Sequence, residues 1–133
     1  MPAVVIDSSV LIALLSRTDT LHPAAALAVA EREATGHRLL VPVVAWAEVF
    51  TGAVRRGADG VSALRTFRDT ALDDIVPVDE QIAEDAAGLR AVDLTLRMPD
   101  ALVVATGRCT DADAVLTGDR RLARVDERVR VVG

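Results

Sequence analysis

Five short apolar runs, each rich in β-branched residues, alternate along this chain with longer segments of helical periodicity. Because the runs are mostly apolar along their whole length, both faces of the strands they form should be covered. An alternation of this kind is typical of repeated β-α-β units around a parallel sheet. The sequence therefore predicts a three-layer α/β fold, in which helices flank a central, mostly parallel sheet of about five strands. The predicted strands are residues 3–7, 38–41, 74–78, 113–117 and 128–132.

Segments with helical periodicity fill the intervals between these strands. Pro23 and Pro99 suit the first turn of a helix, and Gly57 suits the position after a helix end. No linker, repeat or low-complexity tract interrupts the pattern, so residues 1–133 are expected to form a single domain. The predicted helices are a short one directly after Asp7, then residues 24–35, 42–56, 60–72 and 79–97, and one that begins at Pro99.

The composition excludes several classes of protein. Hydrophobic residues make up 51% of the chain, which is incompatible with a disordered protein. The single cysteine, Cys109, cannot form an internal disulfide and indicates a reducing compartment. No apolar run approaches the length that a bilayer requires. We therefore expect a cytoplasmic protein that does not contact a membrane.

The charged and aromatic residues restrict how this chain could recognise nucleic acid. The net charge is −5, which is unexpected for a protein that binds nucleic acid through a basic surface. All 15 basic residues are arginine, so a P-loop or any other site that needs a lysine is excluded. Aromatic residues make up only 2%, which argues against a platform for base stacking. Recognition would have to involve backbone phosphates, with a metal ion as the intermediary.

Four acidic residues occupy positions that this fold would bring together. Asp7 ends the first apolar run, Asp119 follows the run 114–117, Asp100 lies at a helix start, and Glu48 lies within the helix 42–56. In a parallel sheet, strand ends and the adjacent helix starts meet at one edge. Two unit charges about 5 Å apart repel by roughly 3 kcal/mol at an effective dielectric constant near 20, so a cation between them is favoured. Oxygen ligands alone favour Mg²⁺ or Mn²⁺.

Each of these acids also has an ordinary structural explanation. Asp7 suits a helix N-cap, Asp100 is stabilised by the positive end of a helix, and Asp119 suits a turn. Glu48 would be a solvated residue, because it lies off the expected apolar face of its helix. That face comprises Val43, Trp46, Ala47, Phe50 and Val54.

Other polar residues of the chain have simpler explanations than a role in a catalytic site. His22 and His37 could form an acid–base pair that needs no metal, but capping and surface roles suit both residues better. Arg120, Arg121 and Arg124 suit either solvated surface charge or contacts with phosphate.

Four segments around the acids resemble motifs of the PIN-domain nuclease family. Residues 4–11 are similar to its opening motif, a hydrophobic strand that ends in aspartate and is followed by small hydroxyl residues. Residues 47–49 resemble its glutamate motif, 98–106 its third acidic motif and 116–119 its fourth. The order, the spacing and the chain length resemble the stand-alone VapC-type toxins of VapBC type II toxin–antitoxin pairs.

The resemblance implies a Mg²⁺-dependent endoribonuclease, with Mn²⁺ as an alternative metal. By analogy with the family, Asp7 and Asp100 are metal ligands, Glu48 and Asp119 complete the acidic pocket, and Ser9 supports it. A bound metal lowers the pKa of water, which can then attack the phosphodiester, so neither histidine nor lysine is needed. The family also implies an RNA substrate, a cognate VapB-type antitoxin that covers the pocket, and a homodimer.

Several alternatives remain beside this interpretation. A haloacid-dehalogenase-type site would need a second aspartate where Ser9 stands, and a receiver domain would need a lysine. A dinucleotide-binding fold would need a G-x-G-x-x-G motif after the first strand, which the chain lacks. A PIN-like module that only binds RNA or a protein partner stays open, as does DNA as a substrate.

Overall fold

The computed structural model describes all 133 residues and contains one five-stranded parallel sheet. The strand order is β3-β2-β1-β4-β5, so β1 occupies the centre between β2 and β4. All five predicted strands and the parallel sheet are confirmed. The strands are β1 (Ala3–Ile6), β2 (Arg38–Pro42), β3 (Asp74–Val76), β4 (Ala114–Thr117) and β5 (Val129–Val131).

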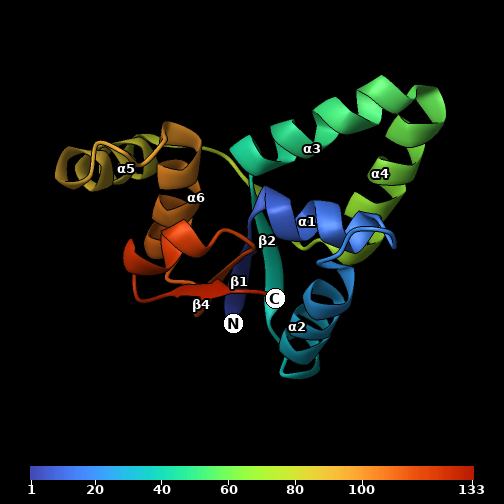
Figure 1. The fold of residues 1–133 in the computed structure, drawn as a ribbon, viewed down its shortest axis with the longest axis horizontal. Coiled ribbons are helices and arrows are strands. Elements are labelled where there is room, and N and C mark those ends of the chain that lie inside the picture. The colour runs from blue at the N-terminus through green and yellow to red at the C-terminus, as the bar shows by residue number, and fades with distance from the viewer.

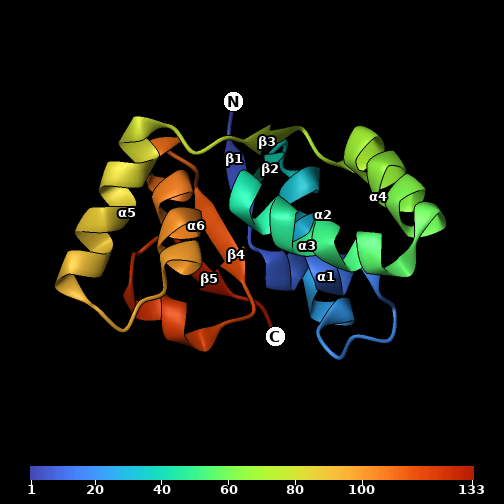
Figure 2. The same cartoon turned by 90° about the horizontal axis from the view of Figure 1, so that it is seen from above.

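Six α-helices complete the three-layer α/β/α architecture that the sequence predicts. Figure 1 shows α5 and α6 on one side of β1 and β2, with α1, α2 and α4 on the other side and α3 across the top. Seen from above, α5 and α6 again lie apart from α1 to α4 (Figure 2). No helix is long and apolar enough to cross a membrane. The helices are α1 (Ser8–Leu15), α2 (His22–Ala34), α3 (Val43–Arg56), α4 (Ala58–Ala71), α5 (Glu80–Val92) and α6 (Met98–Cys109), with a 3₁₀ helix η1 (Arg120–Arg124).

The strand order creates a switch point between β1 and β4. From β1 the chain builds the sheet outward through β2 to β3, and it then returns to place β4 on the other side of β1. In open α/β sheets the crevice outside the carboxyl ends of the strands at such a point is the usual binding site. The residues that follow β1 and β4 therefore lie at this crevice, and they include Asp7 and, after one glycine, Asp119.

Helix α6 packs closely against the sheet and carries Asp100 in its first turn. Ala101, Val104 and Ala105 are fully buried. A Cβ at Gly107 would lie 2.3 Å from Cγ2 of Val115 in β4, so only glycine permits this approach. The close packing fixes the amino end of α6, and with it Asp100, at the carboxyl edge of the sheet.

The predicted helix 79–97 proves too long. Asp79 caps α5 as expected, because its carboxylate accepts a hydrogen bond of 2.8 Å from the backbone N–H of Ile82. The helix ends at Val92, however, and residues 93–97 form a loop. The carboxylate of Asp93 accepts hydrogen bonds from the backbone and the hydroxyl of Thr95, a local turn that competes with helix continuation.

The predicted apolar face of α3 is also wrong. The buried residues of this helix are Ala45, Val49 and Ala53, whereas Val43 and Val54 on the predicted face are exposed. The i, i+4 spacing of two alanines around a valine lets the helix approach its neighbours closely. The bulkier aromatic residues of α3 lie only half-buried beside this face.

Candidate active site

Asp7 lies at the carboxyl end of the central strand and caps helix α1. Its backbone N–H donates to the carbonyl of Leu116, so the residue still belongs to the sheet. Oδ1 accepts from the N–H of Ser8 at 2.7 Å, and Oδ2 accepts from the hydroxyls of Thr117 at 2.7 Å and Ser9 at 3.4 Å. The residue is only 6% exposed. The carboxylate is thus held by neutral donors alone.

The surroundings of Asp7 disfavour its negative charge. Burial is the main cause that raises its pKa, and the hydrogen bonds from Thr117 and Ser8 oppose this rise. The negative charges of Asp100 and Glu48 raise the pKa further. The fold therefore brings three of the predicted acids within electrostatic reach of one another. A cation at this place would relieve the repulsion.

Ser9 and Thr117 join the loop after β4 to the start of α1. The Ser9 hydroxyl, which donates to Asp7, also accepts from the N–H of Gly118 at 2.9 Å. The Thr117 hydroxyl likewise accepts from the N–H of Asp119 at 3.1 Å. A Cβ at Gly118 would lie 2.8 Å from Cδ2 of Leu21 and 3.4 Å from Oγ of Ser9, so a side chain there would crowd this contact.

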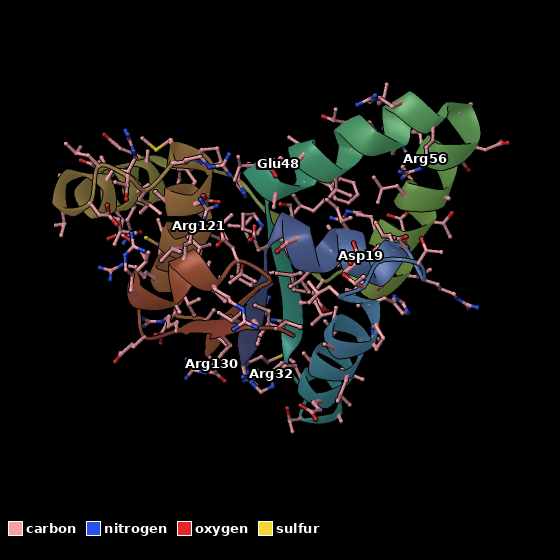
Figure 3. All side chains as sticks on the ribbon, in the orientation of Figure 1. Asp19, Arg32, Glu48, Arg56, Arg121 and Arg130 are labelled. Carbon is pink, nitrogen blue, oxygen red and sulfur yellow. The ribbon has the colours of Figure 1, made fainter.

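Glu48 approaches the site from α3 and is exposed to solvent. The hydroxyl of Ser8 donates to its Oε2 at 2.8 Å. Figure 3 shows Glu48 near the start of α3 at the upper edge of the molecule, while Arg56 lies at the far end of the same helix. Because Ser8 also donates its N–H to Asp7, this one residue links the two acids.

Asp100 and Asp119 each contact an arginine. Nε of Arg97 lies 3.3 Å from Oδ2 of Asp100, whose side chain is 16% exposed. Arg121 contacts Asp119 in a bidentate manner, with Nε 3.1 Å from Oδ1 and Nη2 2.9 Å from Oδ2. These hydrogen bonds from Arg121 are the main cause that lowers the pKa of Asp119. The two acids and the two arginines line one pocket of about 170 Å³.

The oxygen donors at this edge fit Mg²⁺ or Mn²⁺ by their chemistry. All four acids lie at the carboxyl edge of the sheet, and no nitrogen or sulfur ligand stands among them. As the side chains stand, however, no three His, Cys, Asp or Glu residues lie close enough together to hold an ion. Two of the four carboxylates are engaged by arginine, and a third accepts from Ser8. The four carboxylates supply the oxygen donors that these metals need. Asp100, Asp119 and Glu48 would have to release their present partners before they could bind an ion.

The sequence did not single out several residues that shape the site. Thr117 is fully buried and bonds directly to Asp7, yet in sequence it is only the last residue of an apolar strand. Ser8 lies in the opening motif, but the sequence assigns a role only to Ser9 beside it. Arg97 was not weighed as a site residue, and Arg121 was weighed only as a surface charge or phosphate contact. A signal was available for Thr117, since it ends β4 and opens the segment Thr117-Gly118-Asp119 of the fourth motif.

The histidines stand outside this site. His22 is the first residue of α2, and its Nδ1 lies 2.7 Å from the carbonyl oxygen of Ala13 in α1. Nε2 of His37 lies 2.8 Å from Oδ2 of Asp113, and both residues directly precede strands. His37 therefore lies at the amino edge of the sheet, opposite Asp7. Their positions do not form the acid–base pair that the sequence left open.

Comparison with solved structures shows that the fold recurs in toxin–antitoxin proteins. A chain of a toxin–antitoxin complex from Klebsiella pneumoniae superimposes with a TM-score of 0.77 at 23% identity, over 97% of each chain. A chain of VapBC2 from Rickettsia felis, bound to a DNA fragment from its promoter, gives 0.80 at 11% identity, over 98% of this chain and 99% of that one. VapC20 from Mycobacterium tuberculosis, a toxin that cleaves the sarcin–ricin loop, gives 0.70 at 20%, over 94% and 98%.

These identities are low, so the structural similarity shows a shared fold and no more. A search of curated proteins by sequence found no match. The family model of the PIN domain, in contrast, matches residues 4–128, which is nearly the whole chain and includes all four acids. The chain therefore belongs to the PIN domain family.

Proposed function

We propose that this protein is a Mg²⁺-dependent endoribonuclease toxin of the VapC type, with Mn²⁺ as an alternative metal. The observation that carries the proposal is the state of Asp7, a buried carboxylate without a positive partner, on which Asp100 and Glu48 impose further negative charge. Carboxyl groups whose pKa is shifted by burial and by nearby charges are common at functional sites. The fold shared with VapBC proteins and with a toxin that cleaves RNA supports the same reaction class.

Asp7 and Asp100 are proposed as the metal ligands, with Glu48 and Asp119 completing the acidic pocket. A bound divalent cation would supply a water of lowered pKa and a positive charge against the developing charge on the phosphate. Ser9 holds Oδ2 of Asp7 and the loop at Gly118 in place, so it acts on the orientation of the ligand. No lysine exists in the chain, and neither histidine is needed.

The proposed partners are an RNA substrate, a cognate VapB-type antitoxin and a second copy of the chain in a homodimer. Support for the antitoxin comes from the solved relatives, several of which are toxin–antitoxin complexes. A cytoplasmic location is proposed because both RNA and an antitoxin would be met there. Residues 1–133 are proposed to act as a single PIN domain.

The test is cleavage of total cellular RNA by purified protein free of antitoxin, in Mg²⁺, in Mn²⁺ and in EDTA. Asp7→Asn and Asp100→Asn are compared with Asp69→Asn, which changes an exposed aspartate of α4. Discrete cuts that need metal, that persist in the Asp69 variant and that disappear in the other two would support the nuclease. Mapping the cut ends would name the RNA target.

Two results would count against the proposal. Cleavage that survives EDTA and both site substitutions would exclude the acidic pocket as the catalytic site. No cleavage by folded wild-type protein in either metal would favour the alternative, a PIN module that only binds RNA or a protein partner.

A further inference from the structure

We infer that Arg97 and Arg121 are internal counter-ions of the acidic pocket, which leave Asp100 and Asp119 when metal binds and then face the phosphates of the substrate. The inference deepens the proposed function and rests on it. The two arginines would thereby lower the affinity for metal when no substrate is present.

The geometry at Asp119 shows how completely one arginine occupies a candidate ligand. Nε of Arg121 contacts Oδ1, and Nη2 contacts Oδ2, so the guanidinium faces both oxygens at once. The backbone N–H of Arg121 donates to Oδ1 as well, at 2.9 Å. A cation approaching this carboxylate would meet a positive charge already in place. Bidentate pairs of this kind are more specific in geometry than single contacts.

The second arginine extends the same arrangement to Asp100. Nε of Arg97 lies 3.3 Å from Oδ2 of Asp100, and the charge of Arg97 also acts on Asp119. The charge of Arg121 acts in turn on Asp100. Two acids and two arginines thus form one cluster with no net charge, on the walls of one pocket. Asp7 has no such partner, although it lies at the same sheet edge.

Both arginine side chains are largely exposed to solvent. The side chains of Arg97 and Arg121 are 68% and 74% exposed, and neither packs in the core. Exposed ion pairs are weak, so a divalent cation that gains several carboxylate ligands can displace them. A released guanidinium keeps five N–H donors at the rim of the pocket, in a geometry that suits phosphate oxygens. Figure 3 shows Arg121 on the C-terminal segment next to α6.

The inference predicts two effects of opposite sign in a single variant. Arg121→Ala should bind Mn²⁺ about two- to fivefold more tightly than wild type, which corresponds to the usual strength of an exposed ion pair. In saturating Mn²⁺, where the released guanidinium faces the phosphates, the same variant should bind a non-cleavable single-stranded oligoribonucleotide about two- to fivefold more weakly, because a phosphate contact is lost. Arg97→Ala should change both affinities in the same directions and by less, since its contact is longer and single.

Calorimetry for Mn²⁺ and fluorescence anisotropy for RNA measure these affinities without reference to cleavage. Arg120→Ala is the matched control, because Arg120 is an exposed neighbour with no hydrogen bond or ion pair. Arg121→Lys keeps the charge and loses the bidentate contact, so its Mn²⁺ affinity should lie between those of wild type and Arg121→Ala. Circular dichroism confirms that each variant folds.

The outcomes separate this inference from the proposed function. Unchanged or weaker Mn²⁺ binding by Arg121→Ala would overturn the inference and leave the metal-dependent nuclease intact. An equal gain in Mn²⁺ affinity in Arg120→Ala would also overturn it, because the effect would then be one of general charge. No Mn²⁺ binding by wild type or by any variant would overturn both.

Discussion

Asp7 and Asp119 follow neighbouring strands at the same edge of the sheet, yet their surroundings are opposite. Asp7 is buried and held by hydroxyl and backbone N–H groups, and burial raises its pKa. Asp119 is partly exposed and held by a guanidinium group, which lowers its pKa. The topology brings the two acids to one place, and their local surroundings shift their pKa values in opposite directions.

This difference shows which of the two carboxylates is disfavoured in its ionised form. The ionised form of Asp7 is disfavoured by the fold, so another requirement must maintain an acid there. Asp119 with Arg121 is stable without any ligand. A cation could therefore bind at Asp7 without displacing a charged side chain. At Asp119 it must first displace the guanidinium of Arg121.

The largest expected effect comes from removing the hydroxyl that holds Asp7. Thr117→Val should lower RNA cleavage about 10- to 100-fold, the usual cost of losing a group that orients a metal ligand. Rates of RNA cleavage at saturating Mg²⁺ measure the effect. Thr106→Val is the control, because Thr106 is equally buried but bonds only to the carbonyl of Leu102 within α6.

Thr106→Val should lose about 1 kcal/mol of stability for one hydrogen bond, and Thr117→Val about 1–2 kcal/mol, because the Thr117 hydroxyl also accepts from the N–H of Asp119. Only the variant at Thr117 should also lose activity. Equal loss of activity in both variants would mean that Thr117 acts through general stability, and that the hydroxyl has no particular role at Asp7.

A smaller effect, of opposite sign at the two acids, should appear in thermal stability. Asp7→Asn should raise the free energy of unfolding by about 1 kcal/mol, because a disfavoured buried charge is removed. Asp119→Asn should lower it by at most about 1 kcal/mol, because an exposed ion pair is lost. Thermal unfolding at pH 7.5 without metal measures both changes. A lower melting temperature for Asp7→Asn would contradict the view that this carboxylate is strained.

The smallest expected effect is the change with pH in the free energy of unfolding of each variant relative to wild type. The raised pKa of Asp7 disfavours folding above its unfolded pKa of about 4, and the penalty grows as pH rises through the folded pKa. The stability gain of Asp7→Asn should therefore shrink between pH 7.5 and pH 4.5. The lowered pKa of Asp119 stabilises the fold at every pH above about 4. The deficit of Asp119→Asn should consequently stay constant over the same range, and parallel pH profiles for the two variants would argue against the assigned pKa shifts.

Most of the architecture could be predicted from the sequence because its signals are local. Short, mostly apolar runs predicted the strands, and prolines and glycines predicted several of the helix ends. The helix 79–97 was extended too far because the turn at Asp93 depends on one side-chain contact with Thr95, which helical periodicity does not reveal. The face of α3 was misjudged because large residues were assumed to lie inside, whereas close helix packing selected Ala45 and Ala53.

The site was predictable as a gathering of acids but not as a set of contacts. The positions of Asp7 and Asp119 follow from strand order, since Asp7 directly follows β1 and Asp119 follows the neighbouring β4 after one glycine. The roles of Thr117 and Arg121 depend on which atoms meet after folding. A threonine at the end of a strand is also an ordinary β-former, and an arginine after a turn is usually solvated. The roles of Thr117 and Arg121 could therefore be recognised only in the folded structure.

The place of β1 in the sheet affects when the folded state can appear during synthesis. β1 is made first but is complete only when β4 pairs with it, and β4 in turn pairs with β5 at the end of the chain. At 5–20 residues per second, β1 waits roughly 6–25 s for these neighbours on the ribosome. Thr117 and Asp119 arrive in the same late segment. A nascent or truncated chain that lacks residues 117–131 therefore cannot bring Asp119 beside Asp7, so the four acids gather only after β4 and β5 have been made.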